Sequence, residues 1–205
     1  MKIKHLIIIL GLTISCQPNQ DKEVTASYDN GAPQQELTYI NGKTDSLNYD
    51  VKQFNEDGTI EMVGRIRNGK QDGLYTWYYP NGNKKWVENF KNGYSVDTTH
   101  CYYEQGQIKR IIYPSDNGTR KAIEYYDSGE IKIITFLTNG DFIDSTWTAF
   151  YKNRQVKELG NLKTGRRQGV WKFYSDSGQL TDSLDMTGLK KLVFDFEEVE
   201  KSEVK

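Results

Sequence analysis

The sequence is poor in the residues on which enzymes and metal sites depend. It has two cysteines and two histidines among 205 residues. Two cysteines cannot form a disulfide framework, and a zinc site needs more ligands than these residues supply. His100 and Cys101 are neighbours, and neighbours in a strand point to opposite faces. The chain also has no glycine-rich phosphate loop and no EF-hand spacing. We therefore predict no catalytic residue, no metal and no cofactor.

An excess of charge of either sign is also missing. The chain carries 27 Lys and Arg against 28 Asp and Glu, a formal net charge of -1. Such a balance gives no electrostatic reason to expect nucleic acid as a partner. Aromatic residues are plentiful at 13%, with 14 Tyr, although the mean hydropathy is -0.75. Because disordered chains are poor in aromatics, most of this chain should fold.

The only long apolar run lies at the N-terminus. Lys2 and Lys4 precede an apolar stretch from Leu6 to Ile14, which ends at Ser15-Cys16. That stretch is too short to span a bilayer as a helix and is typical of a signal peptide. We predict that the signal peptide comprises residues 1–15. It resembles a bacterial lipoprotein signal, which implies lipidation of Cys16. The membrane contact would then come through the lipid anchor only, in a bacterial cell envelope and at the outer membrane. An ordinary secretory signal with Cys16 as a bystander is the alternative.

Residues 16–45 follow this signal. They are rich in Gln and Asn, contain Pro and Gly, and their first half lacks periodicity. We predict a flexible tether for this segment, with a possible first strand over Glu36 to Ile40.

Residues 46–188 repeat with a period of about 24, counted from a glycine that follows a pair of mostly aromatic residues. The markers are Gly58, Gly82, Gly106, Gly129 and Gly178, and Arg154 stands in the glycine place of a further unit. The fourth residue before each marker is aromatic (Phe54, Tyr78, Tyr102, Tyr125, Phe150, Tyr174). Strand alternation puts this column and the one at minus seven, which includes Tyr75 and Trp171, on opposite faces. Six stacked β-hairpins are therefore expected to form an elongated antiparallel meander, an all-β fold.

Two stretches carry a family resemblance. They are G-K-Q-D-G-L-Y-T-W-Y-Y-P-N-G from Gly69 to Gly82 and G-R-R-Q-G-V-W-K-F-Y-S-D-S-G from Gly165 to Gly178. Both resemble the MORN-variant repeat found in bacterial secreted proteins and lipoproteins, some of which are labelled toxin–antitoxin antitoxins. The resemblance implies tandem β-hairpins and no catalytic residues.

The C-terminal residues, 189–205, contain an alternating stretch from Lys190 to Val199. It predicts a strand that caps the edge of the sheet, followed by a disordered tail.

Candidate binding residues are the large aromatics of the repeats and a basic turn: Tyr75, Trp77, Trp86, Trp147, Trp171, Arg166 and Arg167. Packing within the repeats is the other role open to the aromatics, and a solvated loop the other role for the arginines. The sequence favours a non-enzymatic scaffold that binds a protein partner. An antitoxin or immunity protein that neutralises a toxin and a glycan-binding module are the alternatives.

Overall fold

The computed structural model describes residues 21–114, 118–138, 141–142 and 145–187. These residues form one antiparallel sheet of 17 strands. The strands are β1 (Lys22–Ser27), β2 (Pro33–Tyr39), β3 (Tyr49–Phe54), β4 (Ile60–Arg67), β5 (Lys70–Gln71), β6 (Gly73–Tyr78), β7 (Lys84–Lys91), β8 (Tyr94–Ser95), β9 (Thr99–Tyr102), β10 (Ile108–Ile112), β11 (Thr119–Tyr125), β12 (Ile131–Thr138), β13 (Asp141–Phe142), β14 (Ser145–Phe150), β15 (Val156–Lys163), β16 (Arg166–Tyr174) and β17 (Leu180–Asp185).

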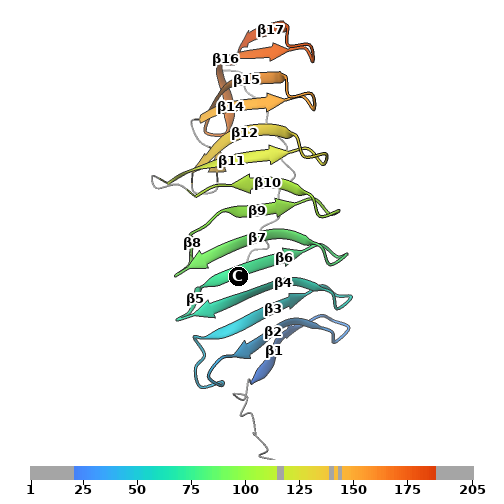
Figure 1. The fold of residues 1–205 in the computed structure, drawn as a ribbon. Coiled ribbons are helices and arrows are strands. Elements are labelled where there is room, and N and C mark those ends of the chain that lie inside the picture. The colour runs from blue at the N-terminus through green and yellow to red at the C-terminus, as the bar shows by residue number, and fades with distance from the viewer. Residues whose placement is uncertain (1–20, 115–117, 139–140, 143–144, 188–205) are drawn as a thin grey trace, which may run out of the picture.

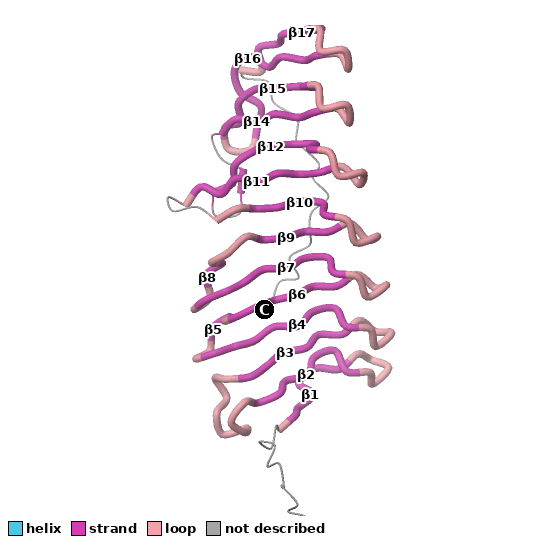
Figure 2. Tube along the Cα trace, in the orientation of Figure 1, coloured by secondary structure: helices cyan, strands magenta, loops and turns pink. Residues whose placement is uncertain are grey.

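The sheet is an elongated single layer in which each of the longer strands pairs with the next longer strand along the chain (Figure 1). The short strands β5, β8 and β13 complete tight turns after β4, β7 and β12, so that β4 also pairs with β6, β7 with β9 and β12 with β14. Figure 2 shows loops at the two long edges of the array and strands between them. The predicted antiparallel meander is confirmed. Within the described residues, no helix is long and apolar enough to cross a membrane.

One edge of the array carries the turns marked in the sequence by glycine. In the turn that joins β6 to β7, Tyr79 N donates to Asn83 O (2.8 Å) and Gly82 N donates to Tyr79 O (2.9 Å). Gly82 has a φ of 84°, a left-handed conformation that glycine adopts without strain. Arg154 has a φ of 70° at the equivalent place, which confirms that it takes the glycine position of its unit.

The opposite edge carries two-residue turns with positive φ at both central positions. They are Asn68-Gly69 (50° and 71°), Asn92-Gly93 (52° and 84°) and Thr164-Gly165 (49° and 72°). This geometry matches the right-handed twist of the flanking strands, and Asn-Gly is its preferred sequence. The alternation of the two turn types along the chain sets the hairpin period.

The sheet begins earlier than the sequence analysis predicted. Residues 16–45 were expected to be a flexible tether, but β1 and β2 lie within them and β2 pairs with β3 along its length. Gly31 has a φ of 81° and marks a seventh turn of the same kind. The prediction missed this unit because Ser27 occupies the position that is aromatic in the later units and because the next marker is 27 rather than 24 residues away. The signal peptide, Cys16 and residues 189–205 lie outside the described residues.

The two faces of the sheet carry different side chains. The cross-strand register places Trp77, Trp86, Cys101, Arg110 and Glu124 in one row. We call the face of the sheet to which this row belongs the tryptophan face. Tyr75, Trp147 and Trp171 lie in the next row of that face, and most of the buried core is there. The other face is centred on Ile111, Ile123 and Ile134, and we call it the isoleucine face. Rings are in contact on both faces, Tyr75 with Trp77 (5.8 Å) and His100 with Tyr102 (6.5 Å), as the alternation predicted.

Candidate binding surface

Tyr75 is a packing residue of the tryptophan face. Its side chain is 2% exposed, and its hydroxyl donates to Arg65 O (2.8 Å). The ring covers Gly64 of the preceding strand, where an added Cβ would lie 2.2 Å from a ring carbon. Burial raises the pKa of Tyr75 to about 12. The ring is therefore held between two strands with its polar atom satisfied.

Trp171 repeats this arrangement near the other end of the array. It is fully buried, and its indole Nε1 donates to Asn161 O (3.1 Å). The ring covers Gly160, where an added Cβ would lie 2.4 Å from ring carbons. Tyr75 and Trp171 each lie 11 residues after the glycine they cover, and each donates to the carbonyl of the residue that follows that glycine. The two rings are the same structural element in two repeats.

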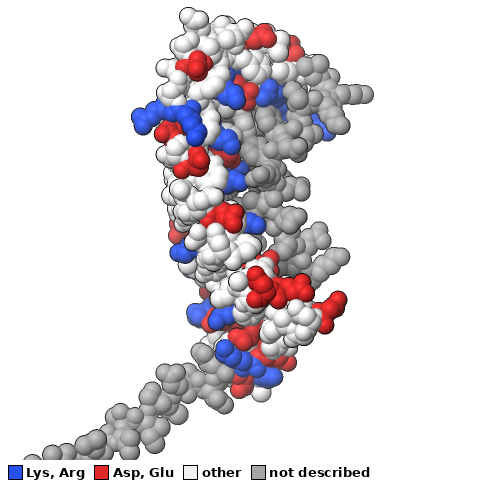
Figure 3. All heavy atoms as spheres, turned by 90° about the vertical axis from the view of Figure 1, so that its right-hand side faces the viewer, with Lys and Arg blue, Asp and Glu red and all other residues white. Residues whose placement is uncertain are grey.

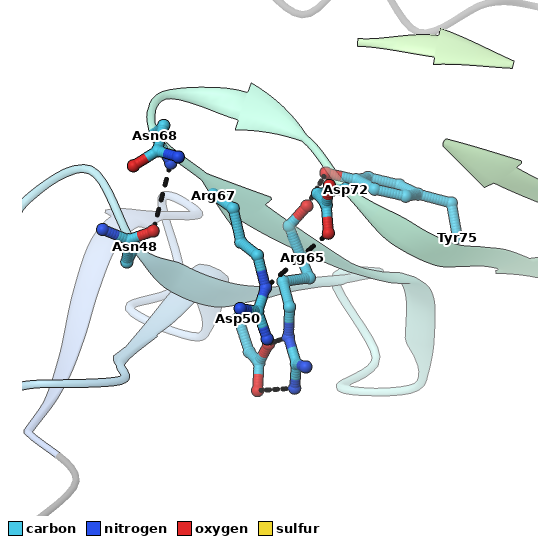
Figure 4. A network of polar contacts seen from close by, with 7 residues as sticks. All are labelled: Asn48, Asp50, Arg65, Arg67, Asn68, Asp72 and Tyr75. Carbon is cyan, nitrogen blue, oxygen red and sulfur yellow. Dashed lines mark hydrogen bonds and ion pairs between the residues drawn. The ribbon is translucent and has the colours of Figure 1, made fainter. Parts of the chain in front are cut away.

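A polar network fixes the tight turn beside Tyr75 (Figure 4). The Arg65 guanidinium binds both carboxylate oxygens of Asp50, with Nη2 at 3.1 Å from Oδ2. Arg67 forms an ion pair with Asp72 (3.6 Å), and Asn68 N donates to Asn48 Oδ1 (3.1 Å). These groups bind one another across β3, β4 and the turn, so they stabilise the hairpin edge.

Trp77 and Trp86 form the half-buried part of the tryptophan face. They are direct cross-strand partners on β6 and β7, and both are only partly buried. The Trp86 indole Nε1 donates to Glu88 Oε2 (3.1 Å). Two adjacent indoles are thus partly exposed, and the hydrogen bond to Glu88 fixes the orientation of one of them. Such a surface can anchor a partner.

Charged groups occupy the middle of the tryptophan face. Glu88 accepts a hydrogen bond from Thr99 Oγ1 (3.2 Å) and forms an ion pair with Arg120 (3.6 Å). Glu124, which is 6% exposed at its side chain, forms ion pairs with Arg110 (2.7 Å) and Lys132 (2.9 Å).

The pKa of Glu124 reflects these contacts. Burial alone would raise the pKa of this carboxyl, but the hydrogen bonds and charges of Arg110 and Lys132 outweigh burial and lower it. The same pairing raises the pKa of Lys132 in spite of its desolvation. Both shifts favour the charged forms of Glu124 and Lys132.

The remaining sequence candidates lie near the C-terminal end. Trp147 is 2% exposed, and its Nε1 donates to Glu158 Oε1 (3.2 Å). The Arg167 guanidinium lies over the Trp171 ring (4.2 Å) and donates to Glu158 Oε2 (2.8 Å). Arg166 follows the tight turn and is exposed. Seven candidates thus divide into three packed aromatics, one indole pair and two arginines in different environments.

Cys101 lies in the row of Trp86 and Arg110 and is buried. Burial raises the pKa of this thiol to about 12, and Arg110 lowers it only in part. Neighbouring His100 points to the isoleucine face, where it stacks on Tyr102. The pair therefore lacks the contact that a thiolate–imidazole couple requires. Among the described residues, no group of three or more His, Cys, Asp or Glu could hold a metal ion.

Sequence reasoning missed the acidic and basic partners of the tryptophan face. Glu88, Arg110, Arg120, Glu124 and Glu158 all point to it. Alternation from Tyr75 and Trp77 assigns them to this face, so the signal was present in the repeat columns. Their pairing could not be read from the sequence because it joins residues 9 to 32 positions apart.

A tyrosine ladder joins neighbouring repeats at the edge of the marker turns. The hydroxyl of one repeat donates to the carbonyl of the next in five pairs, Tyr28–Phe54, Tyr79–Tyr102, Tyr103–Tyr125, Tyr126–Phe150 and Tyr151–Tyr174, at 2.7 to 2.9 Å. A lysine lies over four of these rings, Lys85 on Tyr79, Lys109 on Tyr103, Lys132 on Tyr126 and Lys157 on Tyr151. Figure 3 faces this edge and shows basic and acidic side chains interspersed along the described part of the array. The edge presents no continuous basic stripe.

Comparison with known families finds two matches in this chain. The model of the MORN repeat variant matches residues 71–92 and 167–182, which contain Tyr75 and Trp171. Repeats of this type are binding modules for proteins or membranes and are not catalytic. No curated protein matches the chain.

Proposed function

We propose that this protein is a non-enzymatic scaffold that holds a macromolecular partner, most simply a protein, on its tryptophan face. The proposal rests above all on the partly exposed Trp77–Trp86 pair, because the other large aromatics of this face are buried with their polar atoms satisfied. Next to the pair lie ordered charges on Glu88, Arg120 and Arg110. A central aromatic anchor beside oriented charges is what protein interfaces use for affinity and specificity.

The location is part of the proposal. The sequence before the sheet resembles a lipoprotein signal, and lipidation of Cys16 would attach the scaffold to the envelope, at the outer membrane. The array would then present its face close to the membrane surface. Residues 17–21 would separate the lipid from the first strand.

A crosslinked pull-down of the full-length protein from its own cells tests both parts. We expect one dominant protein partner, lost from the Trp77→Ala/Trp86→Ala double variant and kept by the matched Tyr102→Ala/Tyr125→Ala variant of the opposite face. Capture of the same partner by both variants would contradict the assignment of the face. A Cys16→Ala variant that stays in the membrane fraction would contradict the anchor.

The identity of the captured molecule separates the alternatives. A partner that is toxic when expressed alone makes the protein an immunity protein or antitoxin. If no protein is captured and polysaccharide shifts the tryptophan fluorescence of the wild type but not of the double variant, the surface is a glycan-binding one and the protein-binding proposal is wrong.

A further inference from the structure

The isoleucine face carries an uninterrupted row of uncharged side chains. Its register runs across nine strands through Val63, Thr76, Val87, His100, Ile111, Ile123, Ile134, Thr148 and Leu159. Lys52 precedes the row and Lys172 follows it. All described strands belong to one sheet, so within the described residues no second layer covers this face. Thr76 and Ile123 are buried, and the other members of the row are half-buried. An apolar row of this length is the kind of surface on which proteins associate.

The order of residues in this row is close to palindromic about Ile111. Positions at equal distance from Ile111 pair as His100 with Ile123, Val87 with Ile134, Thr76 with Thr148, Val63 with Leu159 and finally Lys52 with Lys172. Apolar residues match apolar ones in two pairs, threonine matches threonine, and a lysine ends the row on each side. The pair next to the axis differs in kind, because His100 faces Ile123. A two-fold axis parallel to the strands requires this self-complementary order, because residue i then faces residue j and j faces i.

We infer that a second copy of this chain covers the isoleucine face, with the two sheets face to face and the two-fold axis at Ile111. Nine strands spaced by about 4.8 Å span roughly 40 Å, and the row with its two flanking rows is about 20 Å wide. The product, about 800 Å² for each copy, is the area of a standard stable interface. Half-exposed side chains such as Ile108 and Ile131 in the flanking rows would be covered as well.

The charged residues around the row are compatible with this arrangement. Over the same strands the flanking rows contain Arg65, Lys84 and Lys121 as their charged residues. The axis at Ile111 sets Lys84 opposite Ile131 and Arg65 opposite Asn161, so these cations do not meet. Lys52 and Lys172 meet only at the ends, where their long side chains reach solvent. They also limit the interface to the nine strands.

The first experiment measures the oligomeric state of the full chain carrying Cys16→Ser, by sedimentation equilibrium over a wide concentration range. We expect a dimer. Ile111→Glu places a charge on the axis and should weaken dimerisation at least about tenfold, whereas Leu180→Glu, on the same face beyond Lys172, should leave it unchanged. A parent protein that is monomeric at every concentration, or equal effects of the two substitutions, overturns the inference. Monomers that bind vesicles of anionic lipid through this face overturn it as well.

A second experiment tests the axis itself and does not depend on how Ile111→Glu folds. In the same Cys16→Ser chain, Ile111→Cys should be joined into a covalent dimer by a short thiol-specific bismaleimide, because both copies meet at this residue with their sheets about 10 Å apart. Ile134→Cys alone should not, since its two copies lie about 19 Å apart along the sheet in addition to the separation of the sheets, which is beyond the reach of so short a linker. Adding Val87→Cys to Ile134→Cys should restore the crosslink. Efficient crosslinking of Ile134→Cys alone contradicts the proposed register.

Discussion

Side-chain size is matched across the rows of the tryptophan face. Two aromatic rings lie flat on the neighbouring strand, and each lies over a glycine. Tyr75 covers Gly64 and Trp171 covers Gly160. Trp147 follows Thr135 at the equivalent place, and small Ala122 pairs with Ile112. A ring of this size can lie flat on the neighbouring strand only where that strand has no side chain. The pattern explains why a glycine lies under Tyr75 and under Trp171.

Gly64→Ala should lower the free energy of unfolding by about 1–3 kcal/mol, because its Cβ overlaps the Tyr75 ring. Urea denaturation measures this change. The control is the same substitution in a Tyr75→Ala background, where the space is empty and the effect should largely disappear. An equal loss in both backgrounds would show that the glycine serves the backbone and not the ring.

Stability should fall in acid through Glu124. Its pKa is lower in the folded state than in the unfolded state, so its contribution to stability is complete above the unfolded pKa of about 4.5 and is lost as the pH falls through the folded value. Glu124→Gln should therefore destabilise the protein at pH 7 by about 3–5 kcal/mol, since it leaves Arg110 buried without its partner charge. The difference between variant and wild type should shrink in acid, as measured by thermal unfolding across pH. A difference independent of pH would argue against the ion pairs as its cause.

At the scale of elements, the repeat is held together by contacts between one hairpin and the next. The tyrosine ladder joins the backbone of each unit to that of its neighbour, and the ladder is interrupted at Asn55. Asn55 instead donates to Thr59 Oγ1 (2.9 Å) within its own turn. The hairpins on either side of this gap, β3–β4 and β6–β7, are therefore joined by strand pairing and by Tyr75 without the edge hydrogen bond.

Asn55→Tyr should restore the missing hydrogen bond, to Tyr78 O, and stabilise the protein by about 1 kcal/mol. Tyr103→Phe, which removes an existing bond of the ladder, should destabilise it by a similar amount. Chemical denaturation of both variants gives the comparison. If Tyr103→Phe is neutral, the ladder has no role in stability and Asn55→Tyr should also do nothing.

At the scale of the whole molecule, the core consists of separate clusters along a line. One centres on Tyr75 in β2–β6, and another on Trp147 and Trp171 in β12–β16. Between them lie a smaller cluster of Ile112, Ala122 and Leu137 and the charged residues around Glu88 and Glu124. Among the described strands, the main contacts join neighbouring hairpins, so stability should be local and the ends should open independently.

Trp171→Ala should leave a large cavity and cost about 3–5 kcal/mol locally. Native-state hydrogen exchange should then show faster exchange in β14–β17 and unchanged protection in β2–β6. The reverse pattern is expected for Tyr75→Ala. Uniform loss of protection over the entire sheet would show that the array unfolds as one unit.

The sequence by itself determined the hairpin period, the turn positions and the alternation of faces. These are local properties, because Asn-Gly turns need positive φ and side chains in a strand alternate between faces. Each can therefore be predicted from a stretch of a few residues. It also indicated that Arg154 replaces a glycine. Of the first hairpin, β2 was anticipated as a strand over Glu36 to Ile40, but β1 was missed because the aromatic position of this unit holds Ser27. Only the pairing of β1 with β2 and of β2 with β3 reveals the unit.

The tertiary structure alone decided which aromatics pack and which stay partly exposed. Tyr75, Trp147 and Trp171 hold the same repeat position, and Trp77 lies on the same face two residues after Tyr75. Only the structure shows that the first three are buried and that Trp77 is partly exposed. The charged pairs on the tryptophan face and the palindromic row on the isoleucine face also exist only across strands. Register joins residues that are far apart in the chain, and local propensity carries no information about which of them meet.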